Sequence, residues 1–268
     1  ALMTPRTISD GPYVTRFREQ LRYYAVAIAR EPFTKVAGRT SLVNILKNAE
    51  ETRKYDAYHS STIEGYRVSQ EEIQALVENR PMASQVASPE EIERRMALKG
   101  YLEAHGFLMK SIKADFGRKV PISETIIKEI FAHLFLPTID AGLLDKETLT
   151  RYRNHPVYIR NSRYVPPNFE KVGALMLALV EELNKIPNAL TRAILAHYGF
   201  VTVHPYKDGN GRVARFLMNY VLCTSGYRWV TIRAEDRDLY FKALEAAQAD
   251  ENVRPLTAFL ARYFTHRK

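Results

Sequence analysis

Residues 204–215 carry side chains that could together perform chemistry on a phosphorylated substrate. His204 is a base whose pKa normally lies near neutrality, and Asp208 offers the oxygen ligand that Mg²⁺ prefers. A loop with little side-chain bulk follows, so its backbone N–H groups can approach an anion closely. The loop consists of Gly209, Asn210 and Gly211. The order of these residues predicts a base, a metal ligand and an anion-binding loop in succession.

A helix is expected directly after this loop, because apolar residues recur at helical spacing as far as Leu222. The start of a helix binds anions through its free N–H groups and its dipole. Arg212 and Arg215 are three residues apart and therefore share one face of that helix. A polar turn between two helices would also explain the glycines, but it would need neither His204 nor both arginines. The stretch therefore suggests chemistry on a nucleoside triphosphate with a protein nucleophile.

This stretch, His-Pro-Tyr-Lys-Asp-Gly-Asn-Gly-Arg-Val-Ala-Arg, resembles the Fic-family signature H-P-F-x-[D/E]-G-N-G-R-x-x-R, with Tyr206 in place of Phe. Three upstream residues also match many Fic proteins: Ala193, His197 and Phe200. The resemblance implies an all-helical fold with the aromatic ring at 206 anchored in the core and its hydroxyl partnered. It implies a protein adenylyltransferase, which transfers AMP from ATP to a Ser, Thr or Tyr hydroxyl of a target protein. In that reaction His204 is the base, Asp208 holds Mg²⁺, and the loop and both arginines bind phosphates.

A second stretch, residues 60–65, resembles the inhibitory motif of the same family, [S/T]-x-x-x-E-[G/N]. The motif residues are Ser60, Glu64 and Gly65. Alone, the stretch would indicate only a helix end with a C-terminal glycine. Beside the signature, it implies the class whose inhibitory helix, here around 54–65, precedes the core. Glu64 would then pair with Arg215, occupy the γ-phosphate contact and misplace ATP. Ser60 shares a helix face with Glu64 and would hold its carboxylate or contact nucleotide.

Residues 151–169 interrupt the helical pattern, and two short β-rich runs around a polar turn predict a hairpin at about 155–167. In the family, this hairpin is a flap that registers an extended target segment by strand addition. The alternative is a simple connector. The expected docking residues are Val157, Tyr158, Ile159 and Arg160. After the core, the resemblance suggests Tyr240 and Asn252 as adenine contacts.

Helices must position these stretches, and the apolar spacing predicts an all-α chain around the flap. A capping box is expected at Ser69 and Glu72, and Ser88 is expected to cap the next helix. The helices are expected at about 13–30, 40–58, 69–78, 88–114, 123–134, 168–184, 191–203, 212–224, 235–248 and 255–265. We divide the chain into an N-terminal arm and helix (1–39), a helical region with the inhibitory helix (40–120) and a Fic core (121–268).

The composition is that of an ordinary globular protein, with 268 residues, 46% of them hydrophobic and 26% charged. The formal charge of +9 is spread along the chain without a nucleic-acid-binding motif, so ATP or an acidic protein is the expected partner rather than nucleic acid. The single cysteine, Cys223, excludes an internal disulfide and fits a reducing compartment. No apolar run is long enough to cross a membrane and no signal-peptide pattern is visible, so we expect a cytoplasmic protein. A homo-oligomer is compatible with the sequence, but no pattern specifies one.

The sequence therefore favours an adenylyltransferase that Glu64 inhibits, and three alternatives stay open. Phosphotransfer, as in the Doc toxin, would need ATP in the inverted orientation, against which Asn210 and Arg215 argue. Removal of AMP from a modified protein would use Glu64 to orient water. A non-catalytic, nucleotide-responsive binding module would be favoured by a degenerate signature, whereas every catalytic position is present here.

Overall fold

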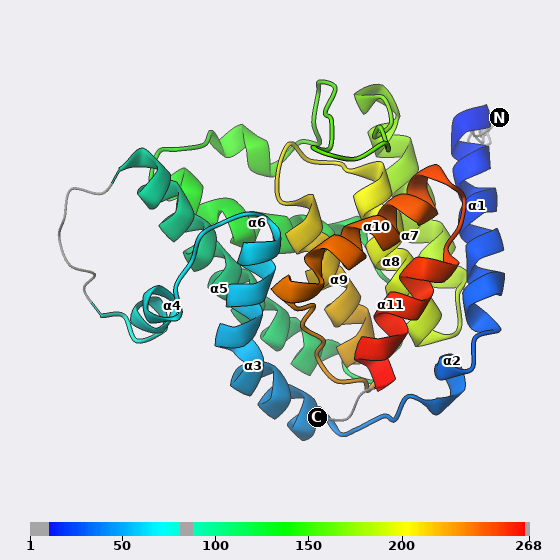
Figure 1. The fold of residues 1–268 in the computed structure, drawn as a ribbon, viewed down its shortest axis with the longest axis horizontal. Helices are drawn as coiled ribbons and strands as arrows, with labels where there is room; N and C mark the ends of the chain where they lie inside the picture. Colours follow the sequence, from blue (N-terminus) through cyan, green and yellow to red (C-terminus); the bar gives the residue numbers. More distant parts are fainter. Residues whose placement is uncertain (1–10, 81–87, 266–268) are drawn as a thin grey trace, which may run out of the picture.

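The structure of the chain is a computed structural model that describes residues 11–80 and 88–265. These residues form helices joined by loops, with no β-strand among them, so the all-α class is confirmed (Figure 1). The α-helices are α1 Pro12–Ala29, α2 Phe33–Val36, α3 Leu42–Ile63, α4 Gln70–Val77, α5 Pro89–Asp115, α6 Glu124–Asp140, α7 Val172–Lys185, α8 Ala189–Val203, α9 Asn210–Thr224, α10 Arg237–Ala249 and α11 Arg254–Thr265. Short 3₁₀ turns are η1 Lys146–Leu149, η2 Phe169–Lys171 and η3 Ala234–Asp236.

Helices α8 and α9 form the centre of the fold, packed against each other and surrounded by the other long helices (Figure 1). Every residue of α8 except Arg192 is buried. A helix that is apolar on all sides belongs in a core, which is why α8 lies between α1 and α7 on one side and α9 on the other. The loop from α8 to α9 carries residues 204–209, so a rigid pair of helices holds the residues with chemical potential.

The predicted helices are present, and the main differences lie at their ends. The capping boxes of Ser69 with Glu72 and of Ser88 with Glu91 are both formed. Helix α3 continues to Ile63, beyond its expected end near residue 58, which puts Ser60 in its last turn. Helix α6 contains Pro137 and continues to Asp140, beyond its expected end near residue 134. The short α2 was not predicted.

The predicted hairpin at 155–167 is wrong, because this segment is an irregular loop without strands. Its one backbone hydrogen bond closes a turn, from the Ser162 N–H to the Ile159 carbonyl at 3.2 Å. Side chains hold the loop instead: Arg163 pairs with Glu245 and Asp250 of the α10 region, and the Tyr164 hydroxyl donates to a carbonyl of α8. Two short runs without a third strand gain little from pairing, so these anchors decide the conformation.

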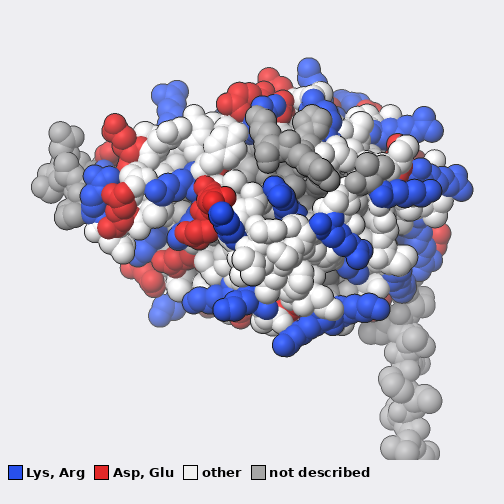
Figure 2. Space-filling view, turned by 90° about the horizontal axis from the view of Figure 1, so that it is seen from below, with Lys and Arg blue, Asp and Glu red and all other residues white. Residues whose placement is uncertain are grey.

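No helix among the described residues is long and apolar enough to cross a membrane. Figure 2 shows lysine and arginine side chains distributed over the face that it presents, with acidic side chains between them, rather than one basic patch. The predicted arm falls largely on residues 1–10, outside the described residues, and the three proposed regions of the chain stay a prediction.

Candidate active site

The loop between α8 and α9 is closed by side chains that the signature contains. His204 ends α8 in the left-handed conformation, with φ of 51°. The Asn210 side chain accepts from the Tyr206 N–H at 3.0 Å and donates to the Tyr206 carbonyl at 2.8 Å, so it fixes the loop. The Tyr206 ring is buried and stacks on Phe131, with 3.6 Å between ring centroids. The ring therefore anchors the loop as expected, but its buried hydroxyl has no hydrogen-bond partner in the described part of the chain.

The His204 ring is oriented as a general base requires. Its Nδ1 lies 3.3 Å from the Val201 carbonyl oxygen, and a carbonyl can only accept, so Nδ1 carries the proton. The lone pair of the neutral ring is then on Nε2. Burial lowers the pKa of His204 most strongly, and the nearby Arg153 guanidinium also lowers it, whereas the contact with Val201 opposes the shift. The imidazole is therefore neutral at physiological pH and free to take a proton.

Asp208 lies beside the start of α9 and is the expected metal ligand. Its carboxylate is 59% exposed, accepts from the Gly209 N–H at 2.6 Å and pairs with Arg212 at 3.2 Å. The described residues contain no group of three or more His, Cys, Asp and Glu side chains that could hold a metal alone. A single accessible carboxylate suits Mg²⁺, which is usually bound by one or two carboxylates together with substrate phosphates.

The first turn of α9 is arranged to receive an anion. Gly209 caps the helix with φ of 83° and no side-chain cap, and a Cβ there would lie 2.5 Å from the Phe135 ring. The N–H groups of a first helical turn have no acceptor within the helix, so those of residues 210–212 are available to a ligand. The Arg212 guanidinium is buried between the rings of Tyr66 and Phe135, each 5.3 Å away. Arg212 therefore adds fixed positive charge to this turn.

Glu64 lies directly against this anion site. Its carboxylate accepts from Arg215 Nη2 at 2.7 Å, so the pair expected from the sequence is present. A Cβ on Gly211 would lie 2.4 Å from Glu64 Oε1, so only glycine lets the carboxylate approach the first turn of α9. Burial alone would raise the pKa of Glu64, but Arg215 and then Arg212 outweigh it and lower the pKa. Glu64 is therefore an anion held where a helix N-terminus and an arginine meet.

Arg215 is nearly fully buried and has further partners on α3. Its Nε donates to Ser60 Oγ at 3.0 Å and its Nη2 to the Ser60 carbonyl at 3.1 Å, whereas Nη1 has no hydrogen-bond partner among the described residues. Burial would lower the pKa of Arg215, but Glu64 reverses this effect and the pKa is raised. Ser60 therefore contacts Arg215 rather than Glu64, and one guanidinium N–H group remains for a ligand.

The end of α3 is fixed on both sides, which places Glu64 reproducibly. Gly65 has φ of 93°, which makes the tight turn after the helix possible, and the Tyr66 N–H reaches back to the Ser61 carbonyl at 3.1 Å. From the start of α10, Arg237 Nε donates to the Ile63 carbonyl at 2.9 Å. The Ala234 N–H donates to His59 Nδ1 at 2.9 Å.

A cavity of about 420 Å³ brings the motif residues together, since Glu64, His204, Gly211 and Arg215 all line it. Tyr240 also lines this cavity, and its hydroxyl lies 2.6 Å from His197 Nε2. Asn252 is not among the described lining residues, because its side chain accepts from the Arg254 N–H at the start of α11. The adenine role of both residues stays a prediction.

The loop residues proposed as a docking flap divide between the cavity and the surface. Ile159 and Arg160 line the cavity, whereas Tyr158 is 79% exposed and Val157 is half-buried outside it. The loop therefore lies over the mouth of the cavity even though it is not a hairpin.

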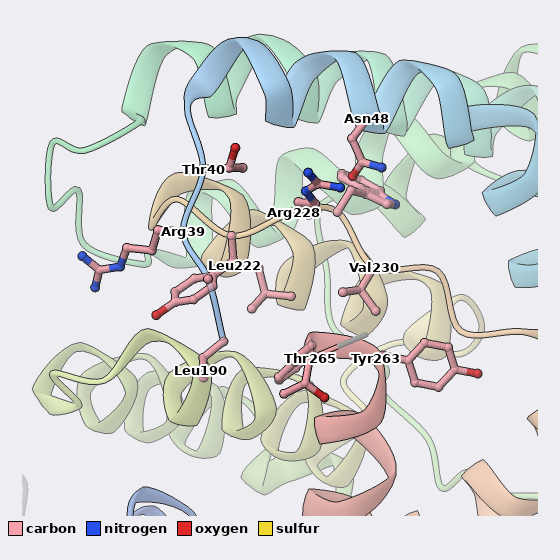
Figure 3. A pocket seen from close by; sticks show the side chains of 13 residues that line it. Arg39, Thr40, Asn48, Leu190, Leu222, Arg228, Val230, Tyr263 and Thr265 are labelled. Carbon is pink, nitrogen blue, oxygen red and sulfur yellow. The ribbon is translucent and has the colours of Figure 1, made fainter. Parts of the chain in front are cut away.

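A larger cavity of about 810 Å³ lies elsewhere, between the start of α3, the end of α9 and the end of α11 (Figure 3). Asn48, Leu222 and Tyr263 are among its lining residues. The described lining contains no His, Cys, Asp or Glu, so it offers a ligand no imidazole, thiolate or carboxylate. Size alone therefore does not identify the active site.

Several residues that shape the site lie outside the two sequence motifs. Tyr66 and Phe135 cover Arg212, and Arg237 closes α3, but no spacing in the sequence indicates these long-range contacts. Asp56 could have been noticed, because it precedes Ser60 by one helical turn. It is buried and accepts from the hydroxyls of Tyr101 and Thr231, which ties α3 to its surroundings.

The fold and site define a helical domain in which a loop between two central helices carries His204 and Asp208, with a candidate anion site at the start of the second helix. Residues 121–222 match the model of the Fic/DOC family. The chain is 32% identical over 212 residues to the protein adenylyltransferase Fic of Nematostella vectensis and 30% identical over 208 residues to that of Drosophila yakuba. Each alignment covers 76% of this chain but only 45% and 39% of the relative, so the chain spans less than half of these proteins.

Solved structures show the same fold. Fic-1 of C. elegans superposes with a TM-score of 0.67 at 24% identity, over 94% of this chain and 70% of that one. A Fic domain containing signaling protein of Bacteroides thetaiotaomicron gives a TM-score of 0.65 at 20% identity, over 93% and 94% of the two chains.

Proposed function

We propose that the chain is a protein adenylyltransferase that transfers AMP from ATP to a hydroxyl side chain of a target protein, and that Glu64 inhibits it. One observation carries this proposal: the carboxylate of Glu64 lies at the anion site formed by Gly211, Arg215 and the first turn of α9. Arg215 keeps one unpartnered N–H group there, and the cavity also contains His204. Full-length relatives that carry the name adenylyltransferase support the reaction type.

The residues of the chain would act as follows. Nε2 of neutral His204 accepts the proton of the target hydroxyl, whose oxygen bonds to the α-phosphorus of ATP while the bond to pyrophosphate breaks. N–H groups of the first turn of α9 bind the phosphates, and Arg212 and Arg215 balance their negative charge. Asp208 would hold Mg²⁺, which supplies charge neutralisation for the phosphate groups. Positioning and electrostatics thus provide most of the acceleration.

The inhibition would follow from competition for Arg215. As long as Glu64 occupies the guanidinium, the γ-phosphate of ATP lacks that contact and like charges repel it. ATP could still enter the cavity, but with its α-phosphorus displaced from the line of attack, and a displacement of about 1 Å can cost about 100-fold in rate. The chain would then belong to the class whose inhibitory helix, here α3, precedes the core.

The loop over the cavity would hold the target. The backbone groups of Val157 and Tyr158 make no backbone hydrogen bond within the described chain, so an extended target segment could pair with them. Such pairing requires no particular target sequence and would bring a hydroxyl to His204.

The test uses wild type, Glu64→Gly and His204→Ala with Mg²⁺ and ATP labelled at either the α- or the γ-phosphorus, with cell extract as acceptor. We expect protein label from the α position, stronger with Glu64→Gly and lost with His204→Ala. Label from the γ position alone would establish phosphotransfer instead. No label from either position, with loss of AMP from a pre-modified protein, would establish AMP removal. If neither reaction is detected, the result would indicate a non-catalytic binding module.

A further inference from the structure

Arg153 is a buried arginine whose partners are all backbone carbonyls. It is 6% exposed, and no described carboxylate pairs with it. Its Nε donates to the His204 carbonyl at 2.8 Å, its Nη1 to the His155 carbonyl at 3.2 Å and its Nη2 to the Pro167 carbonyl. Its own N–H donates to the Pro205 carbonyl at 2.8 Å. One side chain thus joins both ends of the loop over the cavity to the residue that carries the base.

Burial of the Arg153 charge costs desolvation free energy, which suggests that the side chain serves more than packing. Buried arginines are rare unless paired, because desolvation of the charge is expensive. Here burial lowers the pKa of Arg153, as expected for a guanidinium without an acidic partner. The planar fork of guanidinium N–H groups can hold several carbonyls at fixed angles, which a lysine ammonium cannot do.

The carbonyl that Arg153 contacts belongs to a residue with unusual backbone geometry. His204 has φ of 51°, a conformation that is unfavourable for a non-glycine residue and persists only when its surroundings enforce it. Contacts to the His204 and Pro205 carbonyls hold the two peptides that follow this bend, and the His204 N–H donates to the Phe200 carbonyl at 2.9 Å on the side that precedes it. The direction of the imidazole therefore depends on Arg153.

We propose that Arg153 is a positioning residue for His204 that links the loop over the cavity to the base by geometry and by charge. The proposal rests on the proposed function, in which His204 accepts the proton of the target hydroxyl. Through this link, a target segment that binds the loop also settles the peptide that orients the base.

The pKa of His204 depends on every charged or polar group that faces its ring. Arg153 faces it from the loop and lowers its pKa, whereas Glu64 of α3 and Asp208 of its own loop raise it, as does the carbonyl of Val201 in α8. If the Arg153 charge is removed, the pKa of His204 rises. The base is then protonated at higher pH, so the acidic limb of kcat/KM moves to higher pH.

The experiment separates geometry from charge in the Glu64→Gly background. Arg153→Lys keeps the charge and loses the fork, whereas Arg153→Gln loses both. The matched control is Arg192→Gln, because Arg192 is a half-buried arginine that also donates to a carbonyl, that of Ile186, but lies outside the cavity. The readouts are kcat and KM for ATP, the pH profile of kcat/KM, the melting temperature and the NMR titration of His204.

We expect both Arg153 variants to lose about 10- to 100-fold in kcat with KM for ATP changed less than about threefold, as for a misplaced base. Only Arg153→Gln should raise the NMR pKa of His204 and shift the acidic limb, whereas Arg192→Gln should change neither. An unchanged His204 pKa in folded Arg153→Gln, or equal kcat losses in Arg153→Gln and Arg192→Gln, would overturn the proposal. The titration needs no transfer, so it still decides the charge link if Glu64→Gly shows no AMP transfer and the proposed function fails.

Discussion

The pair of Glu64 and Arg215 should stabilise the fold and suppress the reaction, so its removal should change stability and activity in opposite directions. Glu64→Gln keeps the size of the side chain and an acceptor oxygen but removes the charge. Arg215 is then a buried cation with only Ser60 as a hydrogen-bonding partner. The same change frees the phosphate contact, so we expect a less stable but more active protein.

The magnitude follows from the burial of the pair, in which the Arg215 side chain is 6% exposed and that of Glu64 is 23% exposed. Loss of one partner of a buried ion pair costs about 3 kcal/mol, at the lower end of the usual range, because Ser60 still contacts the guanidinium. For a chain of this length, that loss lowers the melting temperature by about 6–12 °C. ATP at about 100 times its Kd should restore about 2.7 kcal/mol to the variant.

The assay combines thermal melts, with and without Mg-ATP, with transfer of label from the α-phosphorus. The matched control is Glu182→Gln, because Glu182 is also buried and pairs with Arg22 and Lys185, away from the cavity. Both variants should melt earlier, but only Glu64→Gln should gain activity and extra stabilisation from ATP. Equal activities of wild type and Glu64→Gln, or an equal ATP effect on the two glutamine variants, would refute the competition for Arg215.

Two further predictions concern stability. Tyr206→Phe removes a buried hydroxyl that lacks a partner but keeps the stack on Phe131. Urea unfolding should therefore show an unchanged free energy of unfolding or a gain of up to about 1 kcal/mol. A loss of more than about 1 kcal/mol would mean that the hydroxyl is hydrogen-bonded. Burial lowers the pKa of His105 to about 4, below its unfolded value, so its stabilisation is complete above about pH 6.5 and is lost as pH falls towards 4. Between pH 7 and 4, wild type should lose about 3 kcal/mol more than His105→Leu, and parallel pH curves for the two proteins would contradict this.

The sequence predicts the site well where side-chain chemistry and local geometry coincide. The spacing from His204 to Arg215 fixes a loop and the first turn of a helix, so the order of residues almost determines their positions. The helix cap at Ser69 and the glycine turn at Gly65 are local for the same reason. The pairing of Glu64 with Arg215 was available only through resemblance, because no local rule brings α3 to α9.

The predictions failed where long-range contacts outweigh local preference. The runs at 157–159 and 164–165 have strand-forming residues, but the anchors of Arg163 on α10 and of Tyr164 on α8 fix the loop in another conformation. For Asn210 the prediction concerned only the backbone N–H group, and it did not include the bonds by which the side chain closes the loop onto the Tyr206 backbone.

The length of α3 determines how the proposed inhibition by Glu64 would work. If α3 ended near residue 58, Ser60 and Glu64 would lie on a free segment whose ordering would cost about 1–2 kcal/mol per residue. The helix continues to Ile63 and is fixed by contacts of Asp56, His59 and Arg237. The packing of α3 therefore already offsets the free energy that ordering this segment requires. Release of Glu64 must therefore act on these contacts or on the last turn alone. In the proposed adenylyltransferase, a partner that displaces η3 or the start of α10 from α3 would be the direct way to relieve the inhibition.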